Sequence, residues 1–123
     1  MADKRTILAI DDNPMNLDIL VNLLLMNYEI LVALSAECAL ELLKKQKVNL
    51  IILDVMMPDM DGIEMTKILK ADKRTKNIPV LLLSANHDKN IIAQGFDAGA
   101  NDYIFKPFSP NELIASIDHH LNR

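Results

Sequence analysis

Residues 49–58 read Asn-Leu-Ile-Ile-Leu-Asp-Val-Met-Met-Pro, an unbroken apolar run from Leu50 to Leu53 with a carboxylate, Asp54, directly after it. A short apolar run followed by turn-forming residues predicts a strand that is buried on both faces, as in the middle of a parallel sheet. Open α/β sheets bind their ligands beyond the carboxyl ends of such strands. Asp54 is therefore the first candidate for a functional residue.

The rest of the chain alternates predicted strands with predicted amphipathic helices. Apolar runs indicate strands at 7–10, 29–34, 50–54, 78–84 and 102–105. Capping residues and apolar spacing indicate helices at about 14–27, from 36, from 62 to about 70, at 89–97 and at 110–121. Five successive strand–helix units predict a parallel sheet with right-handed crossovers and helices on both faces.

Composition excludes several classes of protein. The chain has 123 residues, half of them hydrophobic, which suits one domain spanning residues 1–123. A net charge of -4 gives no reason to expect direct nucleic-acid binding, and a single cysteine excludes an internal disulfide. The longest apolar cluster, 17–26, is too short and too polar to span a membrane. Without a recognisable signal peptide, we expect a cytoplasmic location.

Polar residues that suit phosphate chemistry follow four of the predicted strands. Asp11 and Asp12 follow the first strand, Ser84 ends the fourth and Lys106 follows the fifth. If the first and third strands are neighbours, the two acids and Asp54 meet at one edge of the sheet. Carboxylate oxygens favour a hard cation such as Mg²⁺, with Mn²⁺ as the alternative, and a lysine can hold a phosphoryl oxygen. A carboxylate can also serve as the nucleophile in phosphoryl transfer.

Five motifs in order resemble the receiver domain of two-component response regulators, over essentially the whole chain. They are Asp11-Asp12, Asp54 followed by Met57-Pro58, Asp61-Gly62, Ser84-Ala85, and Tyr103 placed three residues before Lys106-Pro107-Phe108. The resemblance implies a flavodoxin-like doubly wound (βα)5 fold with strand order 2-1-3-4-5. It also implies a signalling switch and not an enzyme acting on other substrates.

The resemblance further implies a role for each site residue. Asp54 would accept the phosphoryl group, while Asp12, Asp54 and the backbone carbonyl of Met56 would bind Mg²⁺ and Asp11 would act through a metal-bound water. Lys106 and Ser84 would hold phosphoryl oxygens, and Tyr103 would turn inward after phosphorylation. Receivers usually have a cis peptide at the position of Lys106-Pro107. Met56 and Asn86 occupy the positions that set the lifetime of the phosphoryl group, and Met56 suggests slow self-dephosphorylation.

The partners implied are a histidine kinase or a histidine phosphotransfer protein, and an output domain or target that the sequence does not name. The output contact would use the face of the fourth helix, fifth strand and fifth helix, and the chain would be a monomer or a weak, phosphorylation-linked dimer. The first helix carries a second apolar line, Met15, Ile19, Leu23 and Met26. In this family the helix docks the phosphodonor, so Met15, Ile19 and Leu23 are candidate docking residues; the alternative is a broad buried face.

Three other functions fit less well. An aspartate-nucleophile phosphatase usually has a second acid two residues after the nucleophile, where this chain has Met56. A nucleotide or flavin binder needs a glycine-rich turn after the first strand, which residues 11–14 do not supply. A receiver that no longer takes phosphate would lack some of these residues. Among the histidines, His119 and His120 are expected on the surface of the last helix.

Overall fold

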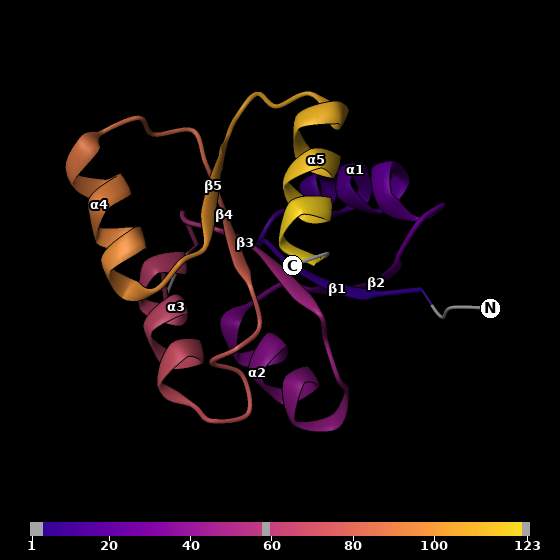
Figure 1. Ribbon diagram of the computed structural model, residues 1–123, viewed down its shortest axis with the longest axis horizontal. Coiled ribbons are helices and arrows are strands. Elements are labelled where there is room, and N and C mark those ends of the chain that lie inside the picture. The colour runs from indigo at the N-terminus through magenta and orange to yellow at the C-terminus, as the bar shows by residue number, and fades with distance from the viewer. Residues whose placement is uncertain (1–3, 58–59, 122–123) are drawn as a thin grey trace.

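The computed structural model describes residues 4–57 and 60–121, and strands and helices alternate throughout (Figure 1). The strands are β1 (Thr6–Ile10), β2 (Glu29–Ala33), β3 (Leu50–Asp54), β4 (Val80–Ser84) and β5 (Asp102–Phe105). The helices are α1 (Pro14–Leu24), α2 (Ala36–Lys45), α3 (Gly62–Ala71), α4 (Lys89–Ala98) and α5 (Pro110–Leu121). None of the helices in these described ranges is long and apolar enough to cross a bilayer.

All five strands are parallel and lie in the order β2-β1-β3-β4-β5, which confirms the predicted flavodoxin-like topology. In the register of β1 and β3, Ile10 is paired with Leu53, so the residues that follow these strands leave the sheet side by side. Ser84 is paired with Phe105 at the same edge. The strand order therefore brings the four polar segments predicted from the sequence to one edge of the sheet.

Each strand contributes side chains to two separate cores. In β3, Ile51 and Leu53 pack with α2, α3 and α4, while Leu50 and Ile52 pack with α1 and α5. Figure 1 shows α1 and α5 together on one side of the sheet and α2 and α3 on the other. Every residue of β3 and β4 is buried, because helices cover both faces of the central strands.

The helix starts follow the capping residues. Side-chain oxygens of Asn13, Ser35, Asp61 and Ser109 accept hydrogen bonds from backbone N–H groups in the first turns of α1, α2, α3 and α5. The carboxylate of Glu112 also accepts a hydrogen bond from the Ser109 N–H, which completes a capping box. Gly99 ends α4 with a φ of 111°, a left-handed conformation that favours glycine.

The first helix is shorter than predicted. It ends at Leu24, with Leu25 as its C-cap, and not near Asn27; in the turn that follows, the N–H groups of Asn27 and Tyr28 both donate to the Leu24 carbonyl. Tyr28 is buried, so the chain must turn toward β2 at this point. Met26, predicted to continue the second apolar line along the helix, lies in this turn and is exposed.

The expectation that His120 lies on the surface is wrong, although His119 is exposed. The His120 ring nitrogen Nε2 lies 3.2 Å from Oδ2 of Asp102, and the side chain of His120 is only 8% exposed. The Ser116 hydroxyl donates to the same carboxylate oxygen, at 3.2 Å. These contacts tie the last turns of α5 to the first residue of β5.

Candidate functional site: a carboxylate cluster at the sheet edge

The three predicted acids lie together where β1 and β3 end. Asp11, Asp12 and Asp54 each offer a carboxylate oxygen, and these oxygens all lie within 4.8 Å of one another. Asp11 and Asp54 are buried, whereas Asp12 is exposed. Adjacent parallel strands cause this convergence, because their carboxyl ends leave the sheet at the same edge.

Asn16 belongs to the site although the sequence did not indicate it. Its side-chain Nδ2 donates to Oδ2 of Asp11 at 3.0 Å, and the backbone N–H of Asn13 donates to Oδ1 of Asp11 at 3.0 Å. Both oxygens of the buried Asp11 are therefore held in place. The sequence contains a weak signal for this role of Asn16, because Asn16 is the third helical residue after the Asn13 cap and therefore lies near the end of β1.

Asp54 and Lys106 form an ion pair across the site. Nζ of Lys106 lies 3.5 Å from Oδ1 of Asp54, which also accepts a hydrogen bond from the Met56 N–H at 3.3 Å. Burial raises the pKa of Asp54 above its usual value, and the neighbouring Asp11 carboxylate raises it further. Lys106 and the Met56 N–H act in the opposite direction but do not cancel the rise in pKa. A positive charge in the cluster therefore favours ionised Asp54.

Two further predicted features lie next to the cluster. The buried Ser84 hydroxyl donates to the Asn86 carbonyl at 3.2 Å and accepts from the Asn86 N–H at 3.0 Å, so the serine is held by the loop after β4. The Lys106-Pro107 peptide is cis, which confirms that prediction. Pro58, part of the predicted Met57-Pro58 motif, lies outside the described residues.

Tyr103 is buried against α4. Its hydroxyl donates to the Ile91 carbonyl at 3.1 Å, and burial raises the pKa of its phenol. The Tyr103 ring is stacked on Phe105, whose other neighbour is the His87 ring. Gly95 allows this arrangement, because a Cβ there would lie 2.1 Å from the Tyr103 hydroxyl oxygen. Tyr103 is thus already inward in this structure, whereas we expected it to turn inward only after phosphorylation. Its inward position depends on Gly95 of α4.

The second apolar line on α1 is only partly a surface feature. Met15 is 73% and Ile19 is 53% exposed, whereas Leu23 packs partly against the core. Ile19 also lines a hollow of about 70 Å³ whose walls include Asp11, Lys106 and Phe108. An apolar surface thus continues from α1 to the carboxylate cluster, and a broad buried face does not describe Met15 or Ile19.

The donor set of the cluster fits a hard divalent cation. Three carboxylates offer oxygen ligands alone, with no sulfur or imidazole among them, and Mg²⁺ is commonly held by one or two carboxylates with waters and a phosphate. Mutual repulsion between carboxylates about 4 Å apart is roughly 4 kcal/mol at an effective dielectric near 20, so a cation would relieve it. Asp11, Asp12 and Asp54 are the side chains that could hold such an ion.

Proteins of similar sequence and structure include a transcriptional regulator and a chemotaxis protein. The curated phosphate regulon transcriptional regulatory protein PhoB of Pseudomonas aeruginosa is 41% identical over 120 residues, which cover 97% of this chain and 52% of PhoB. The crystal structure of Vibrio cholerae chemotaxis protein CheY4 is 28% identical with a TM-score of 0.92 and covers 97% of this chain and 100% of that one.

A third comparison concerns the metal. The receiver domain of a sensor histidine kinase from Pseudomonas aeruginosa was crystallised with a magnesium ion coordinated in its active-site cleft. It is 25% identical with a TM-score of 0.89, and the match covers 98% of this chain and 100% of that one.

The family model for the response regulator receiver domain matches residues 7–118. With this match, the strand order and the edge cluster in agreement, the chain belongs to the response regulator receiver domain family, a family of signalling domains.

Proposed function

We propose that Asp54 accepts a phosphoryl group from a phosphohistidine in a Mg²⁺-dependent reaction, and that residues 1–123 form one receiver domain that this reaction switches. The observation that carries the proposal is the buried Asp54 carboxylate, which lies beside two other acids and 3.5 Å from Lys106. A reactive carboxylate with a cation partner and an oxygen-only metal site is what phosphoryl transfer to aspartate requires.

The transfer is a displacement at phosphorus. An oxygen of ionised Asp54 attacks the phosphorus atom, the phosphorus–nitrogen bond of the phosphohistidine breaks, and the released imidazole nitrogen takes a proton from solvent. Asp11, Asp12, Asp54 and the Met56 carbonyl are the groups that would hold Mg²⁺, with Mn²⁺ as the alternative cation. The metal would neutralise negative charge shared by the carboxylates and the phosphoryl oxygens. Lys106 binds a phosphoryl oxygen and gives up part of its contact with Asp54.

The switch uses groups on β4 and β5. The Ser84 hydroxyl exchanges its Asn86 backbone contacts for a phosphoryl oxygen, and Tyr103 stays in its inward position behind it. The face of α4, β5 and α5 then changes its affinity for an output domain or target, as a shift in populations driven by one local charge. Met56 and Asn86 set how long the phosphoryl group survives, and we propose slow self-dephosphorylation.

The donor is a histidine kinase or a histidine phosphotransfer protein that docks on Met15, Ile19 and Leu23. We place this exchange in the cytoplasm and assign the domain no catalytic turnover beyond its own phosphorylation and dephosphorylation. The chain acts as a monomer or a weak, phosphorylation-linked dimer. The exposed apolar side chains of α1 beside the hollow at Lys106 support this docking surface.

Intact mass spectrometry after incubation with acetyl phosphate tests the proposal. We expect one added phosphoryl group on the wild type in Mg²⁺, none in a chelator, and none on Asp54→Ala. Asp18→Asn, which removes an exposed acid from α1, is the matched control and should be labelled like the wild type. If neither a mass adduct nor released inorganic phosphate is found, Asp54 is not a phosphoacceptor.

A further inference from the structure

A second polar feature lies at the opposite edge of the sheet from Asp54. Segments 44–47 and 73–76 precede β3 and β4, and together they contain six of the 13 Lys and Arg residues of the chain. The chain as a whole has a net charge of -4. Positive charge is therefore concentrated at the edge where the strands begin, and carboxylates cluster at the edge where they end.

The two basic segments face each other across a groove. A hollow of about 370 Å³ has the cations Lys44, Lys45, Lys47 and Arg74 along its walls, and Leu43 and Ile78 contribute apolar surface. We call this hollow the basic groove. No Asp or Glu is among the described residues that line it.

The basic groove continues into a hollow of about 300 Å³ between α2 and α3. Leu43, Lys44 and Arg74 line both hollows, and Leu40 and Ile68 add apolar surface to the second one. Ile68 is 40% exposed, and Glu37, Glu41 and Asp72 also line this second hollow, where Glu41 pairs with Lys44 and Asp72 with Arg74. The second hollow thus adds aliphatic surface next to the basic groove, and the excess of positive charge is confined to the basic groove.

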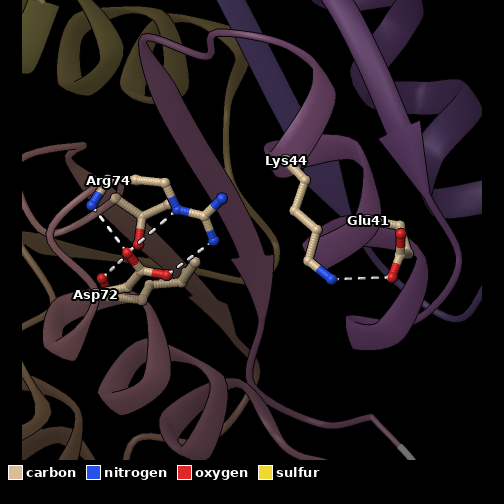
Figure 2. Close-up of polar contacts among 6 residues, drawn as sticks. Glu41, Lys44, Asp72 and Arg74 are labelled. Carbon is tan, nitrogen blue, oxygen red and sulfur yellow. Dashed lines mark hydrogen bonds and ion pairs between the residues drawn. The ribbon is translucent and has the colours of Figure 1, made fainter.

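The cations of the groove are available to a ligand. Figure 2 shows that Arg74 pairs with Asp72 and Lys44 with Glu41, each within its own segment, at 3.2 Å. All four of these side chains are at least 40% exposed, and exposed pairs contribute little and can be exchanged for other partners. Within the described residues, the ion pairs do not involve Lys45 or Lys47. Lysines in the last turn suit the dipole of α2, which accounts for Lys44 and Lys45 but not for Lys47 or Arg74.

We propose that the basic groove binds an acidic polypeptide segment in which carboxylates alternate with aliphatic side chains. The carboxylates would contact Lys45, Lys47 and Arg74, and an aliphatic side chain would cover Ile68. Charge complementarity favours such a partner, because the groove is the positive region of a negatively charged domain. Binding is independent of phosphorylation, since the groove contains none of the residues at the edge of Asp54.

Other anions fit the groove less well. Phosphate binds preferentially where helix amino termini supply backbone N–H donors, whereas the helix ends at this edge are the carboxyl-terminal ends of α2 and α3. No aromatic side chain lines the groove within the described residues, so nucleic-acid bases would have nothing to stack on. A flat membrane surface also could not reach the apolar side chains at the bottom of a hollow.

An NMR titration of the ¹⁵N-labelled domain with the peptide acetyl-Glu-Leu-Glu-Glu-Leu-Glu-amide tests the proposal. We expect saturable shifts in the amides of 43–47 and 74–78, and weaker binding as salt rises from about 0.05 to about 0.5 M. Lys45→Gln/Lys47→Gln should weaken binding by about fivefold or more. A peptide with Ser in place of Leu should also bind more weakly, because it cannot cover Ile68.

Lys67→Gln/Lys89→Gln is the matched control, because it makes the same change in charge at two exposed lysines outside the groove. This variant and Asp54→Ala should bind the peptide like the wild type, and circular dichroism melts should show that every variant is folded. Several results would overturn the proposal: no saturable shifts up to about 5 mM peptide, shifts elsewhere on the domain, or equal weakening in the control. Tighter binding of oligothymidine or of phosphatidylserine vesicles through Lys45 and Lys47 would overturn the choice of a polypeptide.

Discussion

Nζ of Lys106 lies 3.5 Å from Oδ1 of Asp54, in a cluster where Asp11 and Asp12 add two further acids. Burial raises the pKa of Asp54, and the negative charge of Asp11 raises it further, in spite of the ion pair with Lys106. The single ammonium group of Lys106 thus does not offset the burial of Asp54 and the charge of Asp11. The site is therefore electrostatically destabilised without a cation.

Asp54→Asn should stabilise the metal-free domain at pH 7, by on the order of 1 kcal/mol, because it removes one of the mutually repelling buried carboxylates. The pKa of Asp54 is higher in the folded state than in the unfolded state. Asp54 therefore contributes its full share of stability below the unfolded-state pKa of about 3.9, where it is protonated, and this contribution is lost as pH rises through the folded-state pKa. The advantage of the variant should thus shrink as pH falls toward 4. Thermal melts in a chelator at both pH values measure it; a variant no more stable than the wild type at pH 7 contradicts the imbalance.

Asn16→Ala should weaken Mg²⁺ binding by about tenfold, as is typical when a group that orients a metal ligand is lost. The Asn16 amide holds Oδ2 of the buried Asp11, and an alanine leaves that oxygen free to reorient. Calorimetric titration with Mg²⁺ measures the change. Asn22→Ala, at an exposed position of the same helix, is the control and should leave the affinity unchanged. Equal affinities of the Asn16 variant and the wild type would show that Asp11 needs no such support.

Gly95→Ala should destabilise the domain by about 1–3 kcal/mol, as overpacking of a core does. The sign of the change in stability is diagnostic, because alanine in place of glycine at an exposed position inside a helix stabilises the helix by about 1 kcal/mol. Here the new Cβ would lie 2.1 Å from the Tyr103 hydroxyl oxygen and force the ring out of its position. Urea denaturation measures the effect, and Gln94→Ala at the neighbouring exposed position is the control. A more stable Gly95→Ala variant would mean that Tyr103 is not held by contact with α4.

Ile19→Glu should lower kcat/KM for phosphotransfer from a phosphohistidine domain by about tenfold or more, as loss of an apolar anchor at an interface does. Labelling by acetyl phosphate should remain close to that of the wild type, because a small donor needs no docking surface. Met26→Glu, at an exposed apolar residue in the turn after α1, provides the control. Equal loss with both donors would instead indicate damage to the carboxylate cluster.

His120→Ala should lower the free energy of unfolding by about 1–2 kcal/mol, since Asp102 loses a nearly buried partner. His119→Ala removes the same side chain from the exposed neighbouring position and should change stability by less than about 0.5 kcal/mol. Urea denaturation of both variants gives the comparison. Equal effects would mean that the contact between His120 and Asp102 contributes nothing.

Local sequence patterns predicted most of the secondary structure. Caps such as Ser35 and Ser109 start helices at the predicted residues, because they satisfy backbone N–H groups within a few residues of themselves. The sequence predicts an end of α1 that is too late, because Leu25 and Met26 continue an apolar helical pattern, whereas the buried Tyr28 turns the chain toward β2. A helix end set by a distant core cannot be recognised from the periodicity of the helix itself.

Most of the candidate site also follows from local sequence. Asp11, Asp12, Asp54 and Lys106 stand out as polar residues directly after apolar strands, and the structure brings them together. The sequence does not indicate Asn16, because its role depends on a contact with Asp11 that forms only when α1 packs at the end of β1. His120 was placed on the surface, because its partner Asp102 is 18 residues away and lies across a helix–strand contact.

The sequence by itself determined the alternation of strands and helices, the residues at the strand ends and the oxygen-rich chemistry of the site, since these depend on local periodicity and residue type. Only the tertiary structure decided which strand ends are neighbours, how Asp11 is held, that Tyr103 packs over Gly95, and that basic segments that start 29 positions apart in the chain share a groove. These features arise from packing between elements distant in sequence. Their free energy depends on distances across the fold, which no local pattern encodes.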